Sequence, residues 1–163
     1  CGYARTENRY DSIKKEDREI ILNEITSKWN KRNYGDKRTV DEAIETYKLA
    51  LYIGQLLDYK KVDLGSLCLN TAWLYRIKKS QEEMRFLSLA KDFFEEAFYN
   101  ESLVGTNMDE LKLGYLLGET NRRLDLKEQS FKWFNTVLSN PSINLNPMLE
   151  NMVREQWRLT REG

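Results

Sequence analysis

Apolar residues recur every three or four positions along most of the chain, which is the spacing of one face of an α-helix. Residues 16–31 carry Ile20, Ile21, Ile25 and Trp29 at this spacing and are predicted to form the first helix. Six further helices are predicted, over 39–59, 63–78 and 80–100, and from 107, 125 and 146 onward. No segment of the sequence requires a β-strand to explain its pattern of apolar residues.

Polar residues that commonly cap helices stand where the later periodic stretches begin. In a capping box the first side chain accepts from a first-turn amide, and an acidic residue three positions later reaches back to the first residue's amide. The candidate pairs are Thr39 with Glu42, Ser80 with Glu83, Asn107 with Glu110 and Asp125 with Glu128. Asp63 is predicted to cap its helix alone, and Asn146 precedes a proline, which is favourable at a first helical position.

A spacing motif recurs three times: a small residue, an aromatic four positions later, and a small or β-branched residue three beyond. The copies are Ala43, Tyr47, Ala50; Ala90, Phe94, Ala97; and Ser130, Phe134, Val137. Their starts lie 47 and 40 residues apart, against roughly 34 in a tetratricopeptide unit. Before the last copy stands Gly118, where a small residue lets the second helix approach closely while Phe134 fills the space behind it.

These observations predict an all-α fold, a right-handed tetratricopeptide-like solenoid of about three helical pairs and a C-terminal capping helix. The helices pair first with second, third with fourth, and fifth with sixth. The seventh covers the third pair through Met148, Met152, Val153 and Trp157, as the end of a solenoid requires. Residues 1–15 are predicted to form an extended arm, and residues 16–163 to form the helical repeat domain.

The amino-acid composition argues against several classes of function. Lys plus Arg equals Asp plus Glu at 26 each, so no global field directs the chain to nucleic acid or an anionic membrane. Histidine is absent, which excludes Ser/His and Cys/His nucleophile arrangements. No apolar run approaches the roughly 18 to 20 residues that span a bilayer. We therefore expect a cytoplasmic, non-enzymatic protein without a membrane partner.

The two cysteines differ in their surroundings. Cys68 stands at helical spacing from Leu64 and Ala72 and is predicted to be a small core residue. Cys1 is the first residue and is followed by a glycine. A Cys-Gly pair commonly ends a zinc knuckle, because the glycine lets backbone amides turn toward the thiolate. One interpretation is that Cys1 is the last ligand of a zinc ribbon whose other ligands lay upstream. The alternative is that Cys1 is a processed or arbitrary chain end with no role in zinc binding. We expect no cofactor in residues 1–163, and zinc only in a longer protein.

Four segments carry a resemblance to a known family: AIETYKLAL at 43–51, AWLYR at 72–76, GYLLGETNRRL at 114–124 and FKWF at 131–134. They resemble the uncharacterised bacterial family catalogued as domain of unknown function 2225. The resemblance implies a tetratricopeptide-like array preceded by two Cys-x-x-Cys knuckles, the second leading into a Cys-Gly-Tyr-Ala stretch such as residues 1–4. It implies no activity.

Solenoid geometry suggests where a partner binds, because the first helix of each pair lines the concave face. With Gly118 and Ala72 as packing positions, the predicted groove residues are Leu69, Trp73, Arg76, Lys112, Tyr115, Glu119, Arg122 and Arg123. Aromatic and arginine side chains supply much of the contact energy at peptide-binding sites. Aromatic residues at the spacing of Trp73 and Tyr115 are more often core residues in an all-α protein. Arg122 and Arg123 are equally typical of a solvated helix end favoured by the helix dipole.

The function predicted is a non-catalytic scaffold that binds a protein partner, a peptide or helix, in this groove. A first alternative is a nucleic-acid-associated or regulatory protein whose zinc ribbon contacts the polymer; the zero net charge makes nucleic acid an unfavourable partner for these residues. A second alternative, a metal-dependent hydrolase, requires converging carboxylates in a deep pocket, which no motif indicates.

Overall fold

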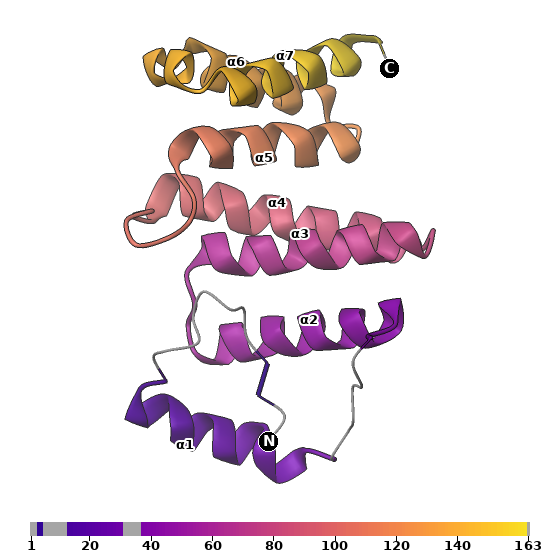
Figure 1. Ribbon diagram of the computed structural model, residues 1–163, viewed down its shortest axis with the longest axis vertical. Helices are drawn as coiled ribbons and strands as arrows, with labels where there is room; N and C mark the ends of the chain where they lie inside the picture. The colour runs from indigo at the N-terminus through magenta and orange to yellow at the C-terminus, as the bar shows by residue number, and fades with distance from the viewer. Residues whose placement is uncertain (1–2, 5–12, 31–36, 163) are drawn as a thin grey trace. The chain divides into compact units, whose positions relative to one another are not determined.

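The computed structural model describes residues 3–4, 13–30 and 37–162. These residues form seven α-helices and two short 3-10 helices and no strand, which confirms the all-α prediction for this part of the chain (Figure 1). The α-helices are α1 (Lys15–Glu24), α2 (Val40–Leu56), α3 (Lys61–Ile77), α4 (Glu82–Asn100), α5 (Glu110–Arg123), α6 (Lys127–Ser139) and α7 (Pro147–Glu162), with the 3-10 helices η2 (Thr26–Lys28) and η3 (Pro141–Leu145).

The chain forms two compact units, Cys1–Phe86 and Leu87–Gly163, and α4 begins in the first and continues through the second. In the first unit, side chains of α1 and α2 share a core cluster of Ile21, Ile25 and Ile53, but α2 packs far more extensively on α3 than on α1, so the predicted pairing of the first helix with the second was wrong. An ion pair between Lys78 and Asp41 joins the C-terminal end of α3 to the start of α2.

The first helix is shorter than predicted. It ends at Glu24 instead of continuing to residue 31, and η2 follows it. The Ser27 hydroxyl donates to the carbonyl of Asn23, a local bond of the kind that competes with helix propagation. The predicted stop at residues 33–36 and most of the predicted arm lie outside the described residues, although Tyr3, Ala4 and Ile13 pack on the α1–α2 cluster.

The capping predictions have mixed outcomes. Thr39 and Glu42 form the complete box: the Glu42 amide donates to Thr39 Oγ1 at 3.2 Å and the Thr39 amide to the Glu42 carboxylate at 2.8 Å. Asn146 accepts from the Leu149 amide, as predicted. Ser80 accepts from the Glu82 amide, but the Glu83 carboxylate binds Arg76 instead of closing the box.

Three predicted caps were wrong. Asp63 lies inside the first turn of α3, because the helix begins two residues earlier at Lys61. The negative charge of Asp63 still interacts favourably with the helix dipole there. Asn107 is replaced by Asp109, whose carboxylate accepts from the Lys112 amide at 2.8 Å. Asp125 does not cap α6, because its backbone is left-handed and belongs to the end of α5.

That ending recurs. The helices α2, α3 and α5 each stop in a Schellman motif, in which a left-handed residue turns two amides back onto the last turn. After α3, the Lys79 amide donates to the carbonyl of Arg76 and the Ser80 amide to that of Tyr75, at 2.8 and 3.0 Å. The left-handed residues are Asp58, Lys79 and Asp125, and none is a glycine.

In the second unit, α5 and α6 approach each other as the spacing motif predicts. A methyl group built on Gly118 would overlap the Phe134 ring, and one on Gly114 would lie 2.7 Å from Val137 Cγ2. The Ser130 hydroxyl donates to the carbonyl of Gly118 at 2.9 Å. The small residues on α5 therefore make room for the branched and aromatic side chains of α6.

The other two copies of the motif are buried to different extents. Ala90, Phe94 and Ala97 are fully buried, whereas in the first copy only Ala50 is. Ala43 and Tyr47 stay partly exposed because the short α1 contacts the C-terminal half of α2, around Ile53, and not its first turns.

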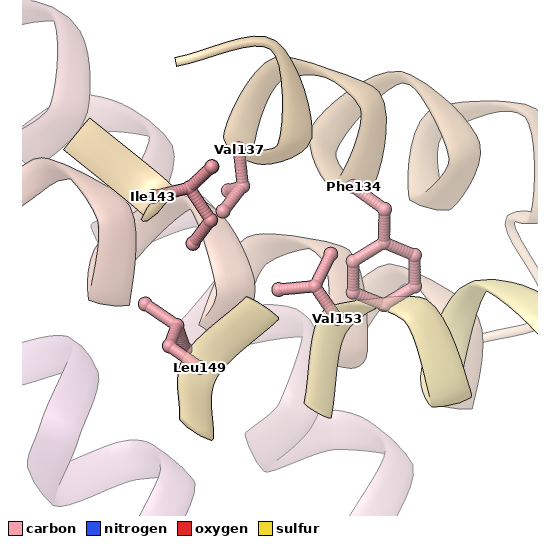
Figure 2. Close-up of a cluster of buried hydrophobic side chains, with 5 residues drawn as sticks. All are labelled: Phe134, Val137, Ile143, Leu149 and Val153. Carbon is pink, nitrogen blue, oxygen red and sulfur yellow. The ribbon is translucent and has the colours of Figure 1, made fainter. Parts of the chain in front are cut away.

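The last helix covers the α5–α6 pair through a core cluster of Phe134, Val137, Ile143, Leu149 and Val153 (Figure 2). Val153 and Trp157 pack as predicted, but Met148 and Met152 are 75% and 42% exposed, and Leu149 takes the buried position. Two of the four predicted contacts of α7 were therefore correct, and the other two, Met148 and Met152, were wrong. No described helix is long and apolar enough to cross a membrane.

Candidate functional site

The predicted groove residues fall into two groups, one on α3 in the first unit and one on α5 in the second. The α3 group comprises Leu69, Trp73 and Arg76; the α5 group comprises Lys112, Tyr115, Glu119, Arg122 and Arg123.

The carboxylate of Glu119 is the centre of the α5 group. Arg122 meets it with a parallel pair of bonds, Nε to Oε2 at 2.8 Å and Nη2 to Oε1 at 3.0 Å. Arg123 forms a close ion pair with the same carboxylate. The Glu119 side chain is 13% exposed, against 25% and 30% for the two arginines. The hydrogen bonds that Arg122 donates to Glu119 raise the pKa of the guanidinium above its ordinary value, so it stays charged.

Tyr115 lies one turn before Glu119 on α5 and is half-buried. Its ring centroid lies 6.3 Å from that of Phe134, at the edge of the core cluster of the second unit. Burial raises the pKa of the Tyr115 hydroxyl, and Glu119 adds to this while Arg123 and Arg122 oppose it. The Tyr115 ring therefore packs against the core cluster on one side, and the rest of the ring is partly exposed to solvent near Arg122 and Arg123.

Lys112 is the outlying member of the α5 group. Its ammonium forms an exposed ion pair with Asp109 at 3.2 Å, in the first turn of the helix. In the described part of the chain, Lys112 forms no hydrogen bond or ion pair with Glu119, so the α5 site consists of Tyr115, Glu119, Arg122 and Arg123, hereafter the α5 face.

The α3 group is not brought together as one surface. Leu69 is buried with 5% exposure, so it belongs to the interior. Arg76 donates from two nitrogens to one oxygen of Glu83, at 2.7 and 2.6 Å, and so joins α3 to the start of α4 within the first unit. Trp73 is 46% exposed, which places the ring at the surface and answers for this residue the question the sequence left open.

Cysteine and acidic side chains are the candidate reactive and metal-binding groups of the described residues. Cys68 is fully buried, as predicted, and burial raises the pKa of its thiol to about 12; the thiol is therefore protonated at neutral pH. Within the described ranges, no group of three or more Cys, Asp or Glu side chains is arranged to hold a metal ion. Cys1, the predicted zinc ligand, lies outside them.

A pocket on the second unit was missed by the sequence analysis. It has a volume of about 350 Å³ and is lined by Asn135 and Leu138 of α6 and by Arg154 and Trp157 of α7. The indole Nε1–H of Trp157 donates to Asn135 Oδ1 at 3.1 Å. Each helix contributes two residues three positions apart, a spacing visible in the sequence, but the sequence does not show that these two helix faces meet.

The Trp157 ring is held on several sides. Phe131 meets it edge-on with centroids 5.2 Å apart, and the Arg161 guanidinium lies 5.6 Å from its centroid. Because the indole nitrogen is also hydrogen-bonded, the orientation of the ring is fixed. This pocket wall is therefore rigid.

Comparison with curated proteins and with solved structures found no match to this chain. A family model matches residues 1–160, and its description is "Uncharacterized protein conserved in bacteria (DUF2225)". The match confirms the resemblance carried by the helical segments. Since it spans almost the full sequence, the chain belongs to this family, DUF2225.

Proposed function

We propose that the chain is a non-catalytic interaction scaffold, a right-handed tetratricopeptide-like array of helical pairs that binds a peptide or a partner helix and needs no cofactor to do so. The observation that carries the proposal is the α5 face. A half-buried tyrosine and two arginines there share one side of a helix, and one carboxylate holds both arginines in place.

This arrangement suits recognition because the side chains are fixed before a partner arrives. Arginine loses rotamer freedom when it is immobilised at an interface, a cost of roughly 0.5–1.5 kcal/mol per side chain. The hydrogen bonds of Arg122 and the ion pair of Arg123 with Glu119 restrict both side chains already on folding, so much of that cost is not incurred on binding. The planar guanidinium groups then offer donor edges and flat faces to a peptide.

The test compares three immobilised baits: the wild-type chain, the double variant Arg122→Gln, Arg123→Gln, and the single variant Arg158→Gln. Arg158 is the matched control, since it is also held between two carboxylates, Glu155 and Glu162, but lies on α7. Proteins retained from a bacterial lysate are quantified for each bait, and circular dichroism checks that all three fold.

The proposal expects a set of proteins that wild type and the control retain and that the double variant loses by tenfold or more, the loss typical of central interface residues. Equal recovery by all three folded baits would show that the α5 face is not the binding surface.

A further inference from the structure

The polar groups of the α6–α7 pocket present hydrogen-bond donors. The Asn135 Oδ1 atom accepts from the Trp157 indole, which can only donate, and the Asn135 Nδ2 group carries two further N–H donors. The other polar lining residue, Arg154, has five N–H donors and no acceptor. The pocket is therefore matched to a ligand that supplies acceptors.

Arg154 keeps one edge open. Its Nε and Nη2 both donate to a single oxygen of Glu150, at 2.9 and 2.7 Å. This uses the side edge of the guanidinium, and no described residue bonds to the end edge formed by Nη1 and Nη2. The side chain is 63% exposed. A carboxylate can therefore approach the end edge in the two-bond geometry that arginine favours.

The other two lining residues make an apolar wall. Leu138 and the rigid Trp157 ring face a volume of about 350 Å³, near the lower limit for small-ligand pockets and sufficient for one large side chain. Arg154 and Trp157 lie three positions apart on α7, so their Cβ atoms are about 5–6 Å apart and both side chains line the same small pocket. One residue of the ligand must reach both.

This short separation distinguishes a chain end from an internal acidic residue. In an extended peptide, neighbouring side chains point to opposite sides, so an internal aspartate and the apolar residue beside it do not enter one small pocket together. A C-terminal residue carries its side chain and its carboxylate on the same Cα atom. We propose that the α6–α7 pocket binds the C-terminal residue of a peptide chain, with an apolar side chain against Leu138 and Trp157 and the terminal carboxylate on Arg154 and Asn135.

The inference concerns a different surface from the α5 face and does not depend on it. The test uses the full chain labelled with ¹⁵N and follows the indole N–H signal of Trp157. Three probes are titrated: acetyl-Ala-Phe with a free carboxylate, the same peptide as its C-terminal amide, and acetyl-Asp-Phe-amide, whose carboxylate is internal. The titrations are repeated on Arg154→Gln and on Arg158→Gln, an α7 arginine outside the pocket lining.

The free acid should shift the indole signal along a saturable curve and bind about tenfold or more tightly than either amide, as expected for a charge-assisted bond. Arg154→Gln should reduce this preference to about twofold or less, and Arg158→Gln should preserve it. Equal binding of the acid and its amide, no shift with any probe, or a preference unchanged by Arg154→Gln would overturn the proposal. Binding of the internal acid as tight as that of the terminal acid would overturn the assignment to a chain end.

Discussion

Gly118 on α5 lies so close to the Phe134 ring on α6 that any side chain at position 118 would overlap the ring. Ser130 strengthens this crossing by donating to the Gly118 carbonyl. The crossing fixes the distance between the two helices that carry the α5 face and one wall of the α6–α7 pocket.

Gly118→Ala should therefore destabilise the protein. Alanine favours a helix interior over glycine by about 0.5–1 kcal/mol, but overpacking costs about 1–3 kcal/mol, and a fully buried ring has little room to yield. We expect a net loss of about 1–2 kcal/mol in the free energy of unfolding, measured by urea denaturation. Adding Phe134→Leu makes room, so the double variant should be less destabilised than the sum of the two single variants; strict additivity would contradict the direct overlap.

Lys79→Gly should stabilise the protein. Lys79 has a left-handed backbone, φ 53°, at the end of α3, a conformation that costs an L-residue about 1–2 kcal/mol and glycine almost nothing. Part of that gain is lost to the greater freedom of glycine in the unfolded chain, so we expect about 1 kcal/mol in urea denaturation. Lys48→Gly, on the exposed side of α2, is the matched control and should lose about 1 kcal/mol. A loss at both positions would contradict the left-handed assignment.

Glu119→Gln should destabilise the second unit and loosen the α5 face. The glutamine keeps the shape but removes the charge that two arginines share, and hydrogen bonds to charged groups contribute roughly 1.5–3 kcal/mol. Allowing for the partial exposure of both arginines, we expect a loss of about 1–2 kcal/mol in urea denaturation at neutral pH. Glu155→Gln removes one of the two partners of the exposed Arg158 and should leave the free energy of unfolding near that of wild type. Equal effects of the two substitutions would argue against the stabilisation of Arg122 and Arg123 by Glu119.

The pKa of the Glu42 carboxyl should be low and should depend on the Thr39 hydroxyl. The Thr39 amide and then its hydroxyl lower this pKa below the ordinary value of 4.5. A depressed pKa in the folded state stabilises the protein above the unfolded-state pKa, and this contribution is lost as the pH falls through the folded-state value.

Titration of the Glu42 carboxyl by NMR checks this expectation. Thr39→Val should raise the Glu42 pKa part of the way to 4.5, since the amide bond stays. Thr46→Val is the control, because the Thr46 hydroxyl donates to the Glu42 backbone carbonyl and not to the carboxylate. A Glu42 pKa that is unchanged in Thr39→Val would contradict the capping box.

Two tryptophans should differ in their contribution to stability. Trp133 is buried and meets Phe98 edge-on with centroids 4.8 Å apart, so Trp133→Ala should cost about 3–5 kcal/mol. Trp73 is at the surface, and Trp73→Ala should cost less than about 1 kcal/mol. Urea denaturation measures both, and a large loss from Trp73→Ala would assign that ring to the core.

The sequence predicted features that depend on one helix or on one short local pattern. Gly118, Ser130 and Phe134 were identified correctly because close helix crossings need small residues at fixed spacings. Asn107 and Asp125 were misassigned because several polar residues precede each helix, and which one caps it depends on where the previous helix stops. Leu69 was assigned to the groove because the concave face of its helix was inferred from a single packing position, Ala72. An error of about one residue in that position is enough to turn the Leu69 side chain inward.

The α6–α7 pocket could not be predicted because its lining residues gain meaning only when two helices meet. Trp157 was expected to pack, and it does, but its indole bond to Asn135 joins residues 22 positions apart. Only tertiary structure reveals such a pairing.

The ion pairs on the α5 face also affect how a partner would arrive. One carboxylate compensates one of the two arginine charges, so the face keeps one net positive charge. Association with an acidic partner would therefore be faster at low ionic strength, because salt screens the attraction between exposed charges.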